Sequence, residues 1–145
     1  MALSGEKLVA TATQVDTQNT AGTTTSTTFT ATLTGGTACG TTFIAPPSGR
    51  VLIFNNLAML NSGANFCLCG VQVRAGGSIG SGTIAYAVSD NDAVTTGGTT
   101  EFGLCRVSLV TGLTAGSTYN VQQLFRVTAG TGTFERKHLV AQPQV

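Results

Sequence analysis

The chain has 145 residues, of which 41% are hydrophobic and 9% charged, and its formal net charge is +1 at pH 7. This length suits one domain with a hydrophobic core and is short for two. The near-zero charge excludes electrostatic steering towards nucleic acid or an anionic membrane, and no apolar run reaches the roughly 20 residues of a membrane-spanning helix.

Threonine and 19 glycines dominate the composition. Threonine is β-branched and fits a pleated surface, whereas glycine supplies the positive φ angles of tight turns. No stretch has the apolar spacing of an amphipathic helix, so we predict an all-β fold. A surface with few charges also repels its neighbours weakly, which favours a building block that packs against other protein surfaces.

Residues 1–25 are polar and rich in Thr, Gln, Asn and Ala, with one short apolar cluster at Leu8 and Val9. Such a segment buries little apolar surface of its own. We therefore predict an extended N-terminal arm over residues 1–25, free or laid over a partner, and a β-sandwich domain over residues 26–145. The first residues lack the basic and apolar regions of a signal peptide, so we expect the protein to stay in the cytoplasm that makes it.

Strict alternation from Ser26 predicts the first strand of the domain, which ends at residues 35–36. Residues 46–49, Pro-Pro-Ser-Gly, predict a reversal of the chain. The strand that follows, residues 50–54, is apolar on both faces. This pattern is expected where one face meets the core and the other is covered by a neighbouring subunit or segment.

Further strands are predicted at residues 67–74, 83–88, 102–110, 119–128 and 133–140. A polar loop over residues 89–100 and a glycine-bearing hairpin at residues 129–132 join some of them. The alternation places on core faces the side chains of Cys67, Cys69, Val71, Val73, Phe29, Phe43, Phe54, Phe125 and Tyr119.

Four cysteines stand at positions 39, 67, 69 and 105. We interpret them first as small buried hydrophobic residues of a reduced protein. A disulfide that forms after release from the cell is the main alternative. Their spacing contains no C-x-x-C pair and gives little support to a metal site, so we predict neither metal nor cofactor.

The segment Leu113-Thr-Ala-Gly116-Ser-Thr-Tyr119 has an apolar anchor, a turn glycine and a tyrosine that begins an alternating strand. It resembles the tyrosine corner of immunoglobulin-like and fibronectin type III sandwiches, in which the tyrosine hydroxyl bonds to upstream backbone. The resemblance implies an antiparallel sandwich of that class. The alternative is an ordinary hairpin with a half-buried tyrosine.

Three stretches carry a wider resemblance: residues 43–51, residues 73–83 and residues 119–133. They are similar to small β-sandwich proteins encoded among the virion structural genes of long-tailed bacteriophages, especially those of actinobacteria. The resemblance implies a virion component assembled in the host cytoplasm: a capsid decoration protein, a head fibre or a minor tail protein. The chain lacks coiled-coil heptads, collagen-like repeats and Trp, which favours decoration of the head.

On that interpretation the protein binds the major capsid protein on the outer capsid surface and stabilises the head, as a homo-oligomer for which a trimer is one arrangement. The arm, with Leu8 and Val9, would order on the capsid. The alternative is a minor tail or head-fibre protein that binds host-surface carbohydrate through Phe66, Tyr86 or Phe102.

Three arginines alternate with apolar residues and are predicted to face away from the core: Arg74, Arg106 and Arg126. They act either as separate solubilising charges or, if they gather on one surface, as donors to acidic groups of a capsid partner. The single histidine, His138, lies in a basic run, and Asp90 and Asp92 fit a turn better than a catalytic pair. We therefore expect no enzymatic activity.

Overall fold

The computed structural model describes residues 12–145, and apart from one 3-10 turn at Asp90–Asp92 the regular elements in that range are β-strands. The strands are β1 (Gln14–Gln18), β2 (Gly22–Thr24), β3 (Gly40–Ile44), β4 (Arg50–Asn61), β5 (Phe66–Ala75), β6 (Ile84–Tyr86), β7 (Val94–Gly97), β8 (Phe102–Val110), β9 (Thr118–Val127) and β10 (Gly132–Gln144).

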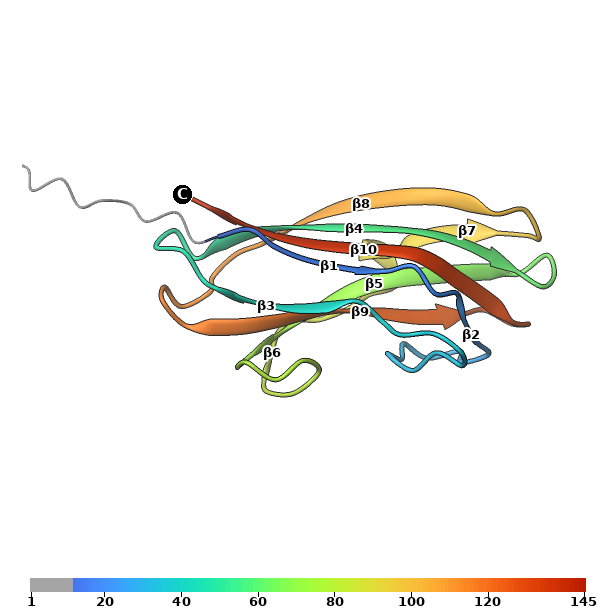
Figure 1. Cartoon of the computed structure of the whole chain (residues 1–145), viewed down its shortest axis with the longest axis horizontal. Helices are drawn as coiled ribbons and strands as arrows, with labels where there is room; N and C mark the ends of the chain where they lie inside the picture. Colours follow the sequence, from blue (N-terminus) through green and yellow to red (C-terminus); the bar gives the residue numbers. More distant parts are fainter. Residues whose placement is uncertain (1–11) are drawn as a thin grey trace, which may run out of the picture.

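The strands form two antiparallel sheets that pack face to face (Figure 1). The first sheet has the order β1-β10-β4-β8, and β2 also pairs with β10. The second has the order β3-β9-β5-β6, and β7 also pairs with β5. The predicted all-β, antiparallel sandwich is confirmed.

The chain passes between the two sheets repeatedly. When the three-residue strands β2 and β6 are set aside, the first sheet holds the first, eighth, third and sixth strands, and the second sheet holds the second, seventh, fourth and fifth. The first and last strands are therefore neighbours. This is the arrangement of a double-sheet jelly roll, and it differs from the strand order of immunoglobulin domains.

Two segments differ from the sequence predictions near the N-terminus. Within the segment expected to be an arm, β1 and β2 pair with β10 and belong to the first sheet. Residues 26–34, expected to be a strand, make only isolated bridges, such as Thr30 with Phe125. Little of the edge of β9 is free for this segment. β3 pairs with residues 118–122 of β9 and leaves residues 123–127.

The predicted hairpin at residues 129–132 is wrong, because β9 lies in the second sheet and β10 in the first. The glycines there serve a turn that crosses between the sheets. Gly130 has a φ of 72°, which glycine adopts without strain. The predicted loop at residues 89–100 contains β7, which pairs with β5.

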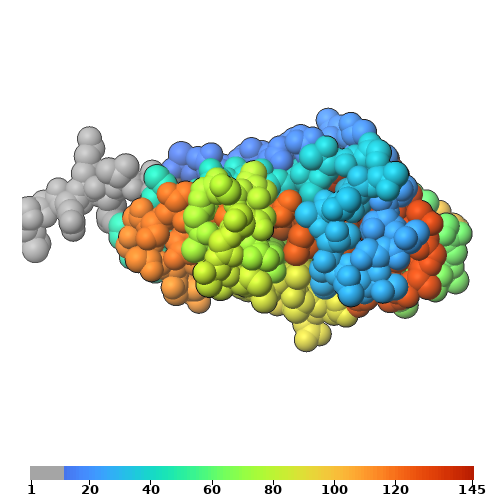
Figure 2. All heavy atoms as spheres, turned by 90° about the horizontal axis from the view of Figure 1, so that it is seen from below, coloured from blue at the N-terminus to red at the C-terminus, as the bar shows by residue number. Residues whose placement is uncertain are grey.

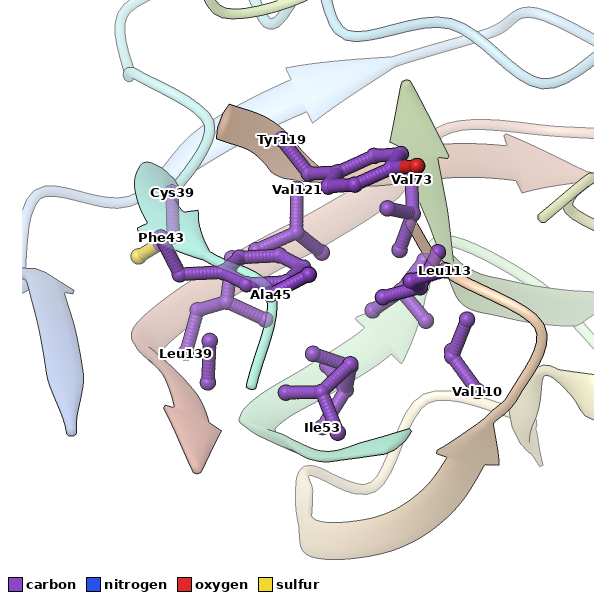
Figure 3. Close-up of a cluster of buried hydrophobic side chains, with 13 residues drawn as sticks. Cys39, Phe43, Ala45, Ile53, Val73, Val110, Leu113, Tyr119, Val121 and Leu139 are labelled. Carbon is purple, nitrogen blue, oxygen red and sulfur yellow. The ribbon is translucent and has the colours of Figure 1, made fainter. Parts of the chain in front are cut away.

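The core between the sheets has two clusters of buried side chains. Figure 3 shows the first, in which the rings of Phe43 and Tyr119 stack with centroids 6.0 Å apart above Ile53 and Val110. The second is built around Phe125 and Phe134, whose centroids are 4.9 Å apart. Burial of such apolar area, at about 25 cal/mol per Å2, is the main stabilising contribution to the sandwich.

A polar contact lies buried between the sheets. Nε2 of Gln123 on β9 donates a hydrogen bond of 2.7 Å to Oδ1 of Asn55 on β4. Nδ2 of Asn55 donates in turn to the carbonyl of Cys69 at 3.1 Å. Both side chains are at most 1% exposed, so the hydrogen bonds are required to offset their loss of water.

Loops cover the outward face of the second sheet. Figure 2 looks onto this side of the molecule and shows the segment after β2, in blue, and the loop around β6, in green, lying over it. At Gly70 of β5 a Cβ atom would come within 2.4 Å of Val88 and 3.7 Å of Phe29. The glycine is thus needed for these covering residues to pack closely.

Candidate protein-binding face of the first sheet

The outward face of the first sheet carries a row of apolar side chains across all four of its main strands. Val15 of β1 pairs with Val140 of β10, Val140 pairs with Phe54 of β4, and Phe54 pairs with Val107 of β8. Residues that face each other across antiparallel strands project from the same side of the sheet. Val15 is 54% exposed and Val107 48%, so this row stands at the surface of the described chain.

Neighbouring rows extend the face without adding charge. Leu52 pairs with Leu109, which is 44% exposed. On the other side of the apolar row, Asn56 pairs with His138 and Cys105. The centre of the face therefore contains no carboxylate, ammonium or guanidinium group.

The orientation of β8 is the reverse of the predicted one. Ser108 and Val110 are buried, whereas Cys105, Val107 and Leu109 are exposed. Phe54 likewise lies on the outward face and not in the core. Arg106 consequently points towards the other sheet, where its guanidinium pairs with Asp92 at 3.0 Å.

The two ends of the face differ in charge. Arg50 begins β4 on the outward side, two residues before Leu52, and no acidic side chain in residues 12–145 forms an ion pair with it. At the far end of β4, Ala58 pairs with Glu135. The two positions are eight residues apart along the strand, a distance of roughly 27 Å.

The acidic end contains two carboxylates and one guanidinium. Arg136 forms an ion pair with Glu101 and lies 3.8 Å from a carboxylate oxygen of Glu135. A hydrogen bond with Glu101, together with burial and the repulsion of that second carboxylate, raises the pKa of Glu135. Beside this cluster lies a shallow hollow of about 360 Å3, bounded by Asn56, Ala58, Gly103, Cys105 and Arg136.

The three predicted capsid-binding arginines do not gather on one surface. Arg106 is in the first sheet, whereas Arg74 and Arg126 are in the second. Arg74 donates to the carbonyl of Gly82 at 2.8 Å and to Gln72. Each guanidinium is thus engaged within the chain. Leu8 and Val9, the other predicted capsid contacts, lie outside the described residues.

Asp90 and Asp92, on the short 3-10 turn, hold two of these arginines. Asp90 receives two hydrogen bonds from Arg126, whose guanidinium also lies 5.5 Å from the ring centroid of Phe29. Asp92 pairs with Arg106. The turn thereby links β9 of the second sheet to β8 of the first, a role that the spacing of the two aspartates alone did not reveal.

The predicted corner residues close one end of the sandwich. The hydroxyl of Tyr119 accepts a hydrogen bond of 3.0 Å from the backbone N–H of Thr114, five residues upstream. Gly116 has a φ of 76°, and Leu113 is buried in the first core cluster. This geometry is what the corner interpretation requires, and it ties β8 to β9 across the two sheets.

The cysteines are free, and three of them are buried: Cys39, Cys67 and Cys69. Burial raises the pKa of the Cys39 thiol to about 12, with a further contribution from Asp16. Cys105, on the outward face, is exposed. Within residues 12–145 there is no cluster of three His, Cys, Asp or Glu side chains suited to a metal ion, and no helix long and apolar enough to cross a membrane.

No protein-family model and no curated protein matches the sequence. Among solved structures, a chain of the T13 viral particle of infectious bursal disease virus is similar, with 9% identity and a TM-score of 0.59, over 99% of this chain and 35% of that one. A structure of the Gx strain of infectious bursal disease virus has 11% identity and a TM-score of 0.41, over 100% of this chain and 42% of that one.

The enzymatically active domain of tailspike protein 4 from bacteriophage CBA120 has 11% identity and a TM-score of 0.39, over 92% of this chain and 20% of that one. This chain therefore spans less than half the length of each of these proteins. At such low identity the likeness to the viral particle chain establishes the fold: a β-sandwich that accounts for nearly the whole of this chain.

Proposed function

We propose that the protein is a structural component of a virus particle, specifically a bacteriophage capsid decoration protein that binds the outer surface of the major capsid lattice and stabilises the head. The observation that carries this proposal is the similarity of 99% of the chain to part of a viral particle protein, at a TM-score of 0.59. Double-sheet jelly rolls are a recurrent architecture of viral capsid domains, and the strand order found here is of that kind.

The outward face of the first sheet supports a role in protein association. It presents Phe54, Val107 and Leu109 to solvent without charged groups between them. Soluble monomers rarely expose a contiguous apolar surface, and such a surface commonly marks an interaction site. A protein with 9% charged residues also meets little electrostatic resistance when many copies pack together.

The proposed role is non-catalytic. The carboxylates that sequence inspection singles out, Asp90 and Asp92, are each occupied by an arginine in a structural link between the sheets. The single histidine, His138, lies on the outward face of the first sheet opposite Asn56. We assign these groups to stability and surface chemistry, and we retain Leu8 and Val9, in the part of the predicted arm before residue 12, as a proposed capsid contact.

The proposal is tested by mixing the purified full-length protein with expanded empty heads of the phage that encodes it, followed by sedimentation of the heads. We expect saturable binding in a fixed ratio to the major capsid protein and a higher temperature of head disruption. Unsaturable or absent binding would contradict decoration. A double substitution of Leu8 and Val9 by Ser should weaken binding if the arm contributes, while leaving the described sandwich intact.

A minor tail or head-fibre protein that binds host carbohydrate is the second candidate. Phe66 at the start of β5 is 53% exposed and Phe102 at the start of β8 is 49% exposed. Exposed aromatic rings are a common platform for sugar rings. This candidate predicts that Phe66→Ala and Phe102→Ala reduce binding of the protein to host cells and leave binding to empty heads unchanged.

A further inference from the structure

We propose that the outward face of the first sheet binds the same face of a second copy of this chain, with the strands of the two copies running in opposite directions about a two-fold axis that follows the row Val15, Val140, Phe54 and Val107. The inference deepens the proposed structural role by naming the partner of this face. It concerns the free protein in solution, so it can fail or succeed independently of any virus particle.

The unequal covering of the two sheets gives the first argument. On the second sheet, residues of the chain's own loops lie over the outward face, and Phe29 and Val88 pack onto Gly70. On the first sheet, Val107 and Leu109 stay 48% and 44% exposed. Within residues 12–145, loops of the chain therefore cover the outward face of the second sheet and leave the outward face of the first sheet exposed.

The size of the face gives the second argument. Three strands spaced about 4.8 Å apart over the stretch from Arg50 to Ala58, with the shorter β1 beside them, present a footprint of roughly 470 Å2 per copy and about 940 Å2 in a dimer. Specific interfaces bury about 1,200–2,000 Å2 in total. The footprint lies below that range, where weak and transient interfaces are found, which predicts a weak, reversible dimer.

The distribution of charge on the face favours a second copy of this chain as its binding partner. One end of the face carries Arg50, a charge of +1, and the other carries Glu101, Glu135 and Arg136, a sum of −1. Reversal of the strand direction about an axis at Phe54 brings Arg50 of one copy opposite Ala58 of the other, beside Glu135. The apolar row then stacks on itself and both charged ends find the opposite sign.

The two-fold arrangement also determines which residues of β8 face each other in the two copies. Because the axis passes through Val107, Cys105 of one copy lies over Leu109 of the other. Cys105 is exposed in the single chain, so its reactivity towards a thiol reagent reports whether the face is open. This thiol is used as a probe and plays no part in holding the copies together.

The experiment is sedimentation equilibrium of the full-length protein and three variants: Arg50→Glu, Glu135→Arg and the double variant. We expect a monomer–dimer equilibrium for the native chain. Each single substitution places like charges at both ends of the interface and should raise the dissociation constant at least about tenfold. The double variant restores opposite signs in reversed order and should recover most of the lost affinity.

Two control variants distinguish loss of the dimer from loss of the fold. Val107→Lys should abolish the dimer, whereas Ile84→Lys, which alters a similarly exposed residue on the second sheet, should leave it intact. Circular dichroism establishes that each variant is folded. The labelling rate of Cys105 should fall as the concentration of native protein rises and should be independent of concentration in Val107→Lys.

A native chain that stays monomeric at about 1 mM overturns the proposal. So does a dimer that survives Val107→Lys, or single charge reversals that the double variant fails to rescue. A monomer in which Cys105 is unreactive also overturns it, because the face is then covered from within the same chain. A monomer that binds empty heads would overturn the dimer alone and leave the proposed function standing.

Discussion

Phe54 of β4 and Val107 of β8 lie directly opposite each other on the outward side of the first sheet, and neither contributes to the core between the sheets. Val107 is 48% exposed. Cross-strand contact between two such side chains stabilises the sheet modestly, by about 0.2–1 kcal/mol. Their main consequence is an apolar surface in a position where another protein can reach it.

Association through this surface makes thermal stability depend on protein concentration. Anything that binds the folded chain and not the unfolded one raises the Tm, so the Tm of the native protein should rise as its concentration is raised from the micromolar range towards about 1 mM. In a Val107→Thr, Leu109→Thr variant, which has β-branched side chains suited to a strand at both positions, the Tm should not depend on concentration. Differential scanning calorimetry at several concentrations measures both, and an equal rise in native and variant proteins would contradict the assignment.

The hydroxyl of Tyr119 supports the end of the sandwich through the N–H of Thr114. Tyr119→Phe removes the acceptor and leaves this backbone donor without its partner inside the chain, which should lower the free energy of unfolding by about 1–3 kcal/mol. Urea denaturation followed by circular dichroism measures the loss. A change within about 0.5 kcal/mol would show that the corner is not structurally important.

Asn55 and Gln123 are coupled across the core, and the coupling can be measured. Asn55→Leu alone leaves the buried amide of Gln123 without its 2.7 Å acceptor and should destabilise the protein by about 2–3 kcal/mol. Asn55→Leu combined with Gln123→Met removes both partners and should destabilise it by less than the sum of the two single changes. Strict additivity in chemical denaturation would rule out the coupling.

Stability should fall in alkaline solution because of the buried thiols. The folded-state pKa of Cys39 is raised from 9.0 to about 12, so above pH 9 the unfolded chain loses a proton that the folded chain retains. The stabilisation is complete below pH 9 and is lost progressively towards pH 12, by at most about 1.4 kcal/mol for each increase of one in pH. The thiol of Cys69, whose pKa is also raised by burial, acts in the same direction.

Comparison with Cys39→Ala isolates that contribution. Lys137, whose pKa is lowered by burial, acts in the opposite direction, since its unfolded form retains a proton that its folded form loses as pH rises towards 10.5. Because the native and variant proteins share this lysine, the difference between their unfolding free energies should shrink as pH increases from 9. Urea denaturation at pH 8, 9 and 10 measures it, and a constant difference would refute the assignment.

Periodicity predicted the approximate positions of the longer strands and, in β5, the side chains that face the core. Cys67, Cys69, Val71 and Val73 lie in the core as predicted, whereas Leu68, predicted to face outward, is also buried because covering loops lie over that face. The tyrosine at the start of β9 was identified from its turn glycine and spacing. These features depend on local pattern, and local pattern is visible in a single sequence.

Where the pattern failed, long-range partners decided the outcome. In β8 Arg106 and Ser108 face inward, where Arg106 pairs with Asp92, and Val107 and Leu109 face outward. The alternating segment at residues 26–34 is not a strand, because β3 occupies much of the edge of β9. The jelly-roll order, in which β1 and β10 meet, depends on contacts more than 100 residues apart and leaves no local signal.

The most direct measurement of the central claim, that this protein is a structural part of a virus head, is electron microscopy of intact particles labelled with gold-coupled antibody against the purified chain. The account predicts label distributed over the head in many copies. Label confined to the tail tip would select the adhesion alternative in place of decoration, and particles that carry no label would contradict a structural role in the virion altogether.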